Sequence, residues 1–293
     1  MNEQIIFIDG NYVKKSEALI SVYDRGLLFG DGVFEGIRAY NGNVFLLEEH
    51  IKRLFNSAKS LMIDIPYNFD ECINIILQTL LKNKLHTAYI RIILSRGVGD
   101  GYNLSPFLCP KPSFMVMAES FEAFPKEYYK SGIEAVTVPT RRTKNDSLSP
   151  QIKSLNYLNN IQAKTEALIA GAQDGIILND EGYVVEATTQ NIFIVKEDRL
   201  LTPYCSLGAL EGITRNFVMR LASNKGIKVE EHLITRHDLY IADEVFMTGT
   251  AAEMIAVVKI DGRVIGQGEP GLLTVKLYEN FLENVEKEGV FFL

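Results

Sequence analysis

Near the midpoint of the chain lies the stretch Ser149-Pro150-Gln151-Ile152-Lys153-Ser154-Leu155-Asn156-Tyr157. The residues before it, 141–148, contain an Asn-Asp-Ser cluster that is typical of turns. After it, apolar residues recur every three or four positions over residues 158–169, which predicts an amphipathic helix. Lys153 is therefore expected where an irregular segment meets a rigid element, so that its amine can be reached by a ligand and still be held in place. Taken alone, such a lysine is more often a solvated surface residue.

Length and composition limit the classes of protein that this chain can be. With 293 residues it is long for one core, so we expect two domains or one large α/β unit. Hydrophobic residues make up 47% and charged residues 23%, which is ordinary for a soluble globular protein. The net charge is −7, and no basic run is longer than the pair Arg141-Arg142, which argues against a nucleic-acid partner.

The sequence also favours a compartment. The first ten residues lack a basic region followed by a long apolar stretch, and no apolar run is long enough to span a bilayer, so we expect a cytoplasmic protein without a membrane partner. Three scattered cysteines fit a reducing compartment. The four histidines have no ligand-like spacing, so no metal site is predicted.

In the first half of the chain, turn signals and periodicity predict a sheet with two helices. Strands over residues 4–8 and 11–14 meet at the hairpin Asp9-Gly10, and a glycine-spaced segment, residues 25–40, leads to a second hairpin at Asn41-Gly42. On spacing alone, those glycines mark either close approach to a ligand or a corner in a sheet. The rest of this half is predicted to form helices over 47–62 and 70–84 and strands over 88–94 and 114–118.

The second half mixes strands and helices without strict alternation, which indicates an α+β fold. Helices are predicted over residues 158–169, 213–224 and 269–286, and strands over 133–138, 175–178, 244–247 and on both sides of 187–190. Prolines and a polar stretch place the domain boundary near the start of this second half of the chain. We therefore divide the chain into a small α/β domain, 1–120, a connection, 121–132, and a larger domain, 133–293.

Arg91 stands in the middle of an otherwise apolar predicted strand, Ala88-Tyr89-Ile90-Arg91-Ile92-Ile93-Leu94. A charge at that position either faces solvent or points into a cavity where it meets an anion. The strand pattern leaves both possibilities open.

Three segments of the second half carry a family resemblance: Glu186-Ala187-Thr188-Thr189-Gln190-Asn191-Ile192-Phe193, Leu200-Leu201-Thr202-Pro203 and Leu210-Glu211-Gly212-Ile213-Thr214-Arg215. Together with the Lys153 stretch and Thr248-Gly249-Thr250-Ala251-Ala252-Glu253, they resemble the fold-type IV pyridoxal-phosphate enzymes. That group includes branched-chain and D-amino-acid aminotransferases and aminodeoxychorismate lyase. The resemblance covers essentially the whole chain, and it implies a two-domain fold whose larger domain is a mixed-sheet pseudo-barrel that binds pyridoxal 5′-phosphate.

The resemblance implies cofactor roles for the matching residues. Lys153 matches the Schiff-base lysine, which also moves a proton between the substrate Cα and the cofactor C4′. Glu186 matches the carboxylate that pairs with the pyridinium nitrogen and deepens the electron sink. The phosphate is expected at the start of a predicted helix, where backbone N–H groups favour an anion. The expected cofactor contacts are Arg53, Lys153, Tyr157, Glu186, Gly212, Ile213, Thr214 and Thr250.

Substrate contacts follow in the same way. Backbone N–H groups at Thr250-Ala251 are expected to bind the α-carboxylate, and Arg91 the second carboxylate of glutamate and 2-oxoglutarate. Where Phe29 stands, some family members carry a tyrosine that contacts the substrate. The expected substrate contacts are Phe29, Phe34, Arg38, Tyr89, Arg91, Thr250 and Ala251.

Within the group, the chain looks most like the branched-chain aminotransferases. The features that indicate this are Phe34-Glu35-Gly36-Ile37-Arg38, Tyr89-Ile90-Arg91 and Tyr157. The implied reaction moves the amino group of L-Leu, L-Ile or L-Val to 2-oxoglutarate in a homodimer or a hexamer of dimers. The alternatives are a D-amino-acid or amine transaminase, a lyase of the same fold, and a binding protein without turnover, which the presence of both Lys153 and Glu186 disfavours.

Overall fold

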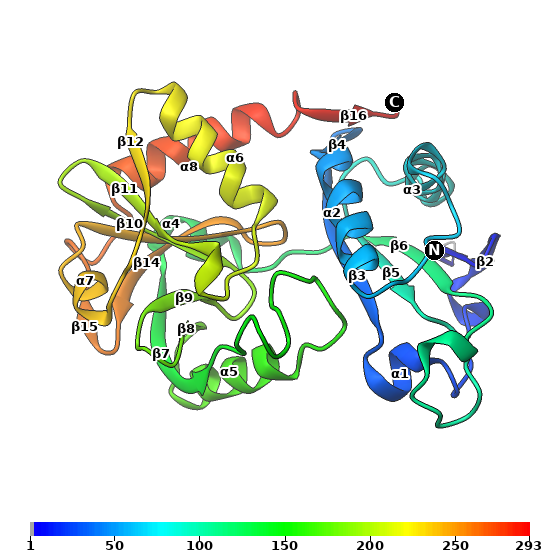
Figure 1. The fold of residues 1–293 in the computed structure, drawn as a ribbon. Coiled ribbons are helices and arrows are strands. Elements are labelled where there is room, and N and C mark those ends of the chain that lie inside the picture. Colours follow the sequence, from blue (N-terminus) through cyan, green and yellow to red (C-terminus); the bar gives the residue numbers. More distant parts are fainter. Residues whose placement is uncertain (1–2) are drawn as a thin grey trace. The chain divides into compact units, whose positions relative to one another are not determined.

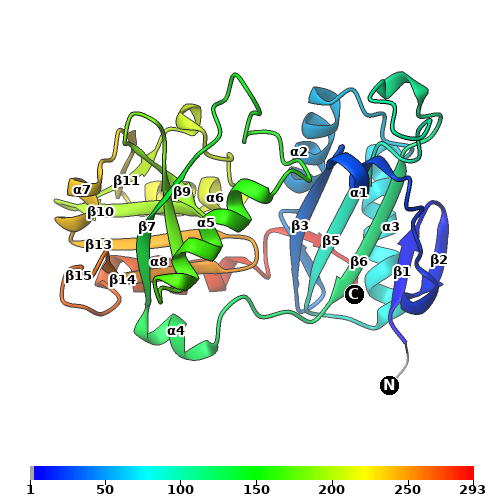
Figure 2. The ribbon, with the colours of Figure 1, turned by 90° about the horizontal axis from the view of Figure 1, so that it is seen from below.

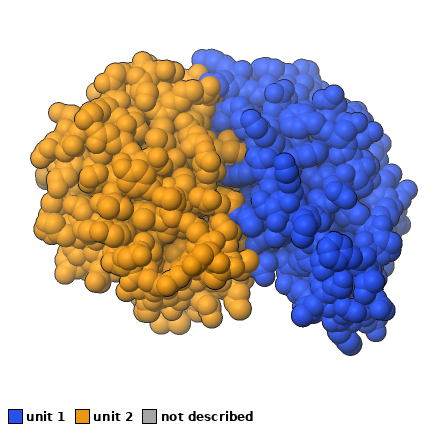
Figure 3. Space-filling model, in the orientation of Figure 1, with its two compact units in different colours: residues 1–121, 152–156, 285–293 blue, residues 122–151, 157–284 orange. Residues whose placement is uncertain are grey.

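The structure is a computed structural model that describes residues 3–293, and its chain divides into two compact units (Figure 3). The first unit runs up to Phe121 and also contains Ile152–Asn156 and Val285–Leu293. The second unit contains Glu122–Gln151 and Tyr157–Asn284. The sequence-based division assigned the Lys153 segment and the C-terminal residues to the larger domain. Local composition marks where a chain leaves a unit, but it does not show where the chain returns.

The first unit is an antiparallel sheet with two helices on one face (Figures 1 and 2). Its seven strands follow the spatial order β16-β4-β3-β5-β6-β1-β2. They are β1 (Ile5–Ile8), β2 (Asn11–Lys14), β3 (Gly32–Tyr40), β4 (Asn43–Phe45), β5 (Ala88–Ser95), β6 (Ser113–Glu119) and β16 (Gly289–Phe291). Its helices are α1 (Arg25–Phe29), α2 (Leu47–Ser60) and α3 (Phe69–Asn83). Both hairpins predicted in this half, at Asp9-Gly10 and Asn41-Gly42, are confirmed.

Local chemistry explains where these helices begin and end. The Asn68 side chain accepts from the Glu71 N–H, while the Glu71 side chain accepts from the Asn68 N–H, so α3 begins with a capping box. The short helix α1 was not predicted, because its five residues had been assigned to the glycine-spaced segment. The Asp24 side chain caps it by accepting from the Gly26 N–H, and Gly30 ends it in the left-handed conformation, with φ 69°.

The second unit is a curled mixed sheet with helices around it. Nine strands take part: β12-β11-β10-β13-β14-β7-β8-β9 in order, with β15 pairing to β14. They are β7 (Ile133–Arg141), β8 (Asp174–Leu178), β9 (Val184–Ala187), β10 (Asn191–Lys196), β11 (Arg199–Pro203), β12 (Lys228–His232), β13 (Glu244–Gly249), β14 (Glu253–Ile260) and β15 (Arg263–Val264). Because the sheet curls, β9 returns against β10 and β11.

Five helices complete this unit: α4 (Lys126–Ser131), α5 (Leu158–Ile169), α6 (Ile213–Asn224), α7 (Arg236–Tyr240) and α8 (Leu272–Asn284). The bounds of α5 and α6 are those that periodicity predicts, whereas α4, β11 and β16 were not predicted. The α+β class with a mixed-sheet larger part is confirmed.

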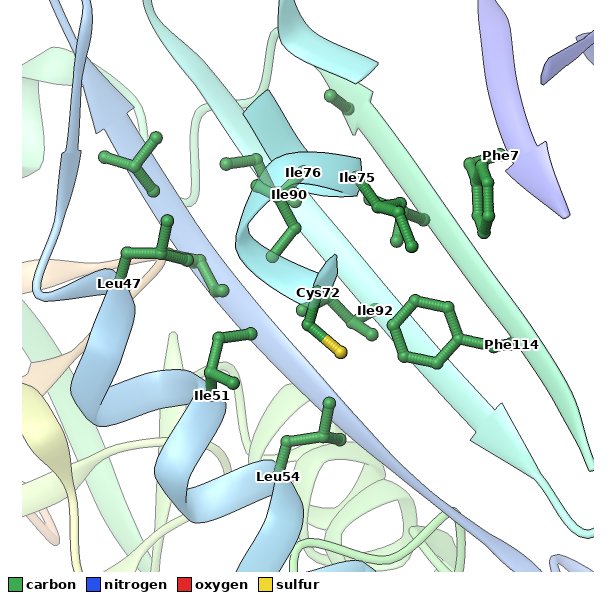
Figure 4. Packing of buried hydrophobic residues seen from close by; sticks show 14 of the residues in the cluster. Phe7, Leu47, Ile51, Leu54, Cys72, Ile75, Ile76, Ile90, Ile92 and Phe114 are labelled. Carbon is green, nitrogen blue, oxygen red and sulfur yellow. The ribbon is translucent and has the colours of Figure 1, made fainter. Parts of the chain in front are cut away.

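The core of the first unit lies between its sheet and the helices α2 and α3 (Figure 4). Leu47, Ile51 and Leu54 of α2 face Ile90 and Ile92 of β5, and all five are fully buried. Burying an aliphatic side chain of this size contributes about 1.5–3 kcal/mol. Cys72 of α3 lies within this cluster, so its thiol acts as a small apolar group.

The burial of Cys72 makes a chemical prediction. Burial raises the pKa of the Cys72 thiol to about 12, so at pH 8 only about one thiol in ten thousand is ionised. In native protein, Ellman's reagent should react with the half-exposed Cys109 and leave Cys72 untouched until urea unfolds the chain. Peptide mapping after limited labelling distinguishes the two, and equal rates at both thiols in native protein would contradict the packing of this core.

Candidate active site

The backbone of Lys153 is fixed against β3 and α2. The Phe34 N–H donates to the Lys153 carbonyl at 3.0 Å, and the Leu155 N–H donates to the Gly32 carbonyl at 2.9 Å. The Lys153 N–H donates to Ser57 Oγ, at 3.2 Å. The short segment around Lys153 therefore behaves as an added edge strand, and the Lys153 amine starts from a rigid base, with Nζ 4.5 Å from the centre of the Phe34 ring.

Four of the predicted substrate residues share one face of the first unit's sheet. In the antiparallel pair β3–β5, Arg38 lies opposite Tyr89 and Gly36 lies opposite Arg91. Directly opposed residues point to the same side, and Phe34, Gly36 and Arg38 alternate with residues that point to the other side. The structure thus brings together Phe34, Arg38, Tyr89 and Arg91.

Arg91 lies between two aromatic rings on this face. Its guanidinium carbon is 4.5 Å from the centre of the Phe34 ring and 5.5 Å from that of Tyr89. Among residues 3–293, no carboxylate lies within ion-pair distance of Arg91. Gly36 makes room for this arrangement, since a Cβ atom there would be 2.1 Å from Tyr89 Oη. The side chain of Arg91 therefore carries a positive charge on an aromatic surface, where an anion can compete for it.

Phe29 and Arg53 lie elsewhere in the first unit. Phe29 is the last residue of α1, and the guanidinium carbon of Arg25 lies 5.0 Å from the centre of its ring. Phe29 makes no ring contact with the aromatic residues of the sheet face. Arg53 is on α2, where it forms a bidentate pair with the buried Glu35 at 2.7 and 2.9 Å. Its contact with a phosphate stays a prediction.

Glu35 accepts from His50 as well as from Arg53. Its Oε2 lies 2.8 Å from His50 Nδ1. Burial alone would raise the pKa of Glu35, but the Arg53 charge and the His50 hydrogen bond outweigh burial and hold the pKa well below its usual range. Burial lowers the pKa of His50, so its ring is neutral and donates through Nδ1–H.

In the second unit, Glu186 of β9 is buried and held by three donors. Glu186 Oε1 lies 2.7 Å from Arg142 Nη2. Its Oε2 accepts from the Leu210 N–H at 3.1 Å and from Asn191 Nδ2 at 3.4 Å. Arg142 is itself fixed, because it donates to the Gly208 carbonyl at 3.1 Å and to two asparagine side chains of α5. These contacts hold the Glu186 carboxylate in one orientation.

Asn191 connects Glu186 to the start of α6. Asn191 Nδ2 donates to the Leu210 carbonyl at 2.9 Å, and the helix begins after Gly212. A Cβ atom at Gly212 would lie 1.9 Å from Asn191 Oδ1, so only glycine fits there. Asn191 also lies opposite Thr248, at the end of β13 that leads into the turn with Thr250 and Ala251. The second unit thus gathers Glu186, Gly212–Thr214 and the Thr250 turn.

The start of α6 suits the phosphate of the predicted cofactor. The N-cap is Gly212, which offers no side chain to accept from the first-turn N–H groups. Those N–H groups and the positive end of the helix favour a dianion. Tyr157, which precedes α5, is half-buried in the same unit. The groups present therefore fit pyridoxal 5′-phosphate, with a carboxylate to accept from its ring nitrogen and N–H groups to donate to its phosphate.

Sequence reasoning missed Arg142 and the part that Asn191 plays. The pair Arg141-Arg142 was noted only as the longest basic run, and nothing in its surroundings indicates that one arginine is buried while the other is exposed. Among residues 3–293, no cluster of His, Cys, Asp and Glu is arranged to hold a metal ion. Within the same residues, no helix has the length and apolar character needed to cross a membrane.

Arg142 and its neighbour provide a matched pair of variants. Arg142→Met removes the cation that pairs with the buried Glu186 carboxylate, and breaking a buried pair in this way costs roughly 3–5 kcal/mol. Arg141 is exposed, so Arg141→Met should change the free energy of unfolding by less than about 0.5 kcal/mol. Urea unfolding without added cofactor measures both. Adding Glu186→Gln to Arg142→Met should restore part of the loss, and equal stability of the two single variants would argue against the pair.

Comparisons with known proteins show the family. The family described as amino-transferase class IV matches residues 32–260. A protein of Methanocaldococcus jannaschii, named a putative branched-chain-amino-acid aminotransferase, is 50% identical over 97% of this chain and 98% of its own length.

Solved structures agree as well. The branched-chain amino acid aminotransferase of Escherichia coli superposes with a TM-score of 0.95 at 33% identity, covering 99% of this chain and 97% of that one. The branched-chain amino acid aminotransferase of Thermobaculum terrenum, in its PLP-bound holo form, gives a TM-score of 0.88 at 29% identity, covering 97% and 94%. The chain therefore belongs to the class IV aminotransferases.

Proposed function

We propose that this protein is a branched-chain-amino-acid aminotransferase. It moves the amino group of L-Leu, L-Ile or L-Val to 2-oxoglutarate, giving the branched-chain 2-oxo acid and L-glutamate, in two half-reactions that share one site. The observation that carries the proposal is the junction in the second unit, where the Glu186 carboxylate accepts from Leu210 just before the open N-terminus of α6. The full-length similarity to branched-chain aminotransferases supports the choice of substrate.

The second unit supplies the ring and phosphate contacts. Pyridoxal 5′-phosphate, when bound, supplies an electron-poor ring that stabilises negative charge at the substrate Cα. Glu186, which pairs with Arg142, would accept from the protonated ring nitrogen and so favour the protonated ring. The N–H groups of Ile213 and Thr214, with the Thr250 side chain, would bind the phosphate, and the Tyr157 hydroxyl would donate to the ring oxygen.

The first unit supplies the amine and the substrate face. Lys153 Nζ would be the amine that holds the cofactor at its aldehyde carbon, and as a free amine it would move the proton of the substrate Cα. The fixed backbone around Lys153 limits where that amine can reach. Phe34 and Tyr89 would form apolar walls for the substrate side chain, with Phe29 and Arg38 as further contacts. The α-carboxylate would be bound by a turn of the second unit, at Thr250-Ala251.

We also infer that the protein is a homodimer or a hexamer of dimers in the cytoplasm. Residues 19–27 and 98–108 expose large apolar side chains, among them Leu19 at 79% and Phe107 at 84%. The two segments meet, because Asp24 bridges to Val98. An apolar patch of this kind marks an interaction surface, and a second copy of the chain is the proposed occupant.

A panel of amino donors tests the proposed function. With 2-oxoglutarate as acceptor, L-Leu, L-Ile and L-Val should each produce glutamate at least about tenfold faster than D-Ala or an aromatic amine, because the apolar walls favour branched side chains. Borohydride reduction of the same protein should attach the cofactor to the peptide that contains Lys153. A D-Ala rate above that of L-Leu would favour the D-amino-acid alternative, and labelling at Lys144 or Lys164 would overturn the role of Lys153.

Arg91 should discriminate between the two half-reactions. A carboxylate pair with Arg91 contributes roughly 1.5–3 kcal/mol, so Arg91→Leu should lower kcat/KM for glutamate and 2-oxoglutarate about tenfold to a hundredfold. The half-reaction with L-Leu, followed in single turnover by the cofactor absorbance, should change less than about threefold, because an apolar side chain makes no ion pair. Equal losses in both half-reactions would mean that Arg91 is structural or binds the α-carboxylate, and Arg38, on the same face, would become the candidate.

A further inference from the structure

A carboxylate lies in the core of the first unit, and the proposed roles do not explain it. Glu35 is in the middle of β3, and its side chain has no exposed surface. It points away from the substrate face, because its neighbours Phe34 and Gly36 point toward that face. Taking a charge out of water costs several kcal/mol even in a pair, and an apolar pair of the same size is often as stable. Stability alone therefore does not account for this residue.

The contacts of Glu35 fix the orientation of the Arg53 side chain. Its two oxygens grip one edge of the guanidinium, Nε at 2.7 Å and Nη2 at 2.9 Å. His50 Nδ1 donates to the same carboxylate at 2.8 Å, which stops the carboxylate from turning. Because the guanidinium is planar and rigid, fixing one edge also fixes the direction of the rest of the group. The Arg53 side chain is 14% exposed, whereas the Glu35 side chain is fully enclosed.

This cluster lies beside the Lys153 segment. His50, Arg53 and Ser57 follow one another on α2 at spacings of three and four, which places them on one side of the helix. Ser57 Oγ accepts from the Lys153 N–H at 3.2 Å, and Lys153 is among the charges that act on the His50 ring. The guanidinium of Arg53 is thus fixed one helical turn from the segment that carries the reactive amine.

We propose that Glu35 is a positioning residue, which fixes the Arg53 guanidinium so that it meets the 5′-phosphate of the cofactor, with His50 locking Glu35 in place. The proposal rests on the proposed function, since it assigns the phosphate to Arg53. Glu35 itself touches neither cofactor nor substrate. Its effect is to fix the plane and direction of the Arg53 guanidinium.

Two ligands that differ only in the phosphate test this proposal. The full-length protein, freed of cofactor, is titrated with pyridoxal 5′-phosphate and with pyridoxal, and binding is followed by absorbance. Glu35→Gln keeps the size of the side chain but removes the charge, and it should weaken pyridoxal 5′-phosphate binding about tenfold to a hundredfold. Pyridoxal binding should change less than about threefold. Glu49→Gln, on the exposed side of α2, is the matched control and should change neither.

A second variant shows whether Glu35 acts through Arg53. Arg53→Lys keeps the charge beside Glu35 but removes the planar fork, and it should give the same loss that is selective for the phosphate. If Glu35 acts only by holding Arg53, the double variant Glu35→Gln/Arg53→Lys should bind no more weakly than Arg53→Lys alone. If Glu35→Gln fails to fold, Glu35→Asp takes its place in the same titrations, because the shorter side chain keeps the charge but loses the two-point contact with Arg53.

The outcomes separate the positioning role from the proposed function. Equal weakening of both ligands by Glu35→Gln, or additive losses in the double variant, would overturn the positioning role and leave the cofactor assignment intact. Wild-type protein that binds neither ligand would overturn the proposed function and the positioning role together.

Discussion

The backbone pairing between β3 and the segment around Lys153 fixes the reactive amine, and the first unit's part of the site is arranged around that pairing. β3 has neighbours on both sides, Lys153 at one edge and β5 at the other. Because side chains alternate along a strand, the same nine residues supply Phe34 to the substrate face and Glu35 to the α2 side. A slip of one residue would exchange an aromatic wall for a buried charge. The register is therefore fixed by function and packing together.

Each unit contains a buried carboxylate paired with an arginine. In one pair the arginine orients the carboxylate, and in the other pair the carboxylate orients the arginine. In the second unit Arg142 is enclosed and orients Glu186, the group that faces the cofactor ring in the proposed reaction. In the first unit Glu35 is enclosed and orients Arg53, the group proposed to face the phosphate. In both pairs the partner that does no chemistry is fixed by further hydrogen bonds. The desolvation cost of such pairs is understandable where direction, rather than stability alone, is required.

Local signals in the sequence predicted much of the fold. Periodicity predicted the bounds of α5 and α6, and the dipeptides Asp9-Gly10 and Asn41-Gly42 predicted two hairpins of the first unit, because these features depend on neighbouring residues. The short helix α1 has too few residues to show a period, and the edge strand β16 depends on a partner about 245 residues away in sequence. That the Lys153 segment belongs to the first unit could not be predicted for the same reason, because its partners lie on β3, far away in sequence.

The site was predictable to the extent that it is carried by motifs. Lys153 and Glu186 stand in runs that the family resemblance makes recognisable, so their roles could be proposed before the structure. The residues that orient them could not be predicted in this way. Arg142 is separated from Glu186 by 44 positions, and only folding brings the two side chains to 2.7 Å. An arginine that is buried looks in sequence like its exposed neighbour, so charge pairing has to be read from the structure.

The placement of Arg91 explains how one face can accept both an apolar and an acidic side chain in the proposed reaction. Its guanidinium lies on the rings of Phe34 and Tyr89, and Gly36 leaves the space that the Tyr89 hydroxyl needs. A cation on aromatic faces is stabilised by roughly 0.5–2 kcal/mol, whereas a carboxylate partner contributes roughly 1.5–3 kcal/mol. The two states of Arg91 therefore differ by little. An apolar substrate leaves the arginine on its rings at small cost, and an acidic substrate draws it into an ion pair, so neither partner of the reaction has to be excluded.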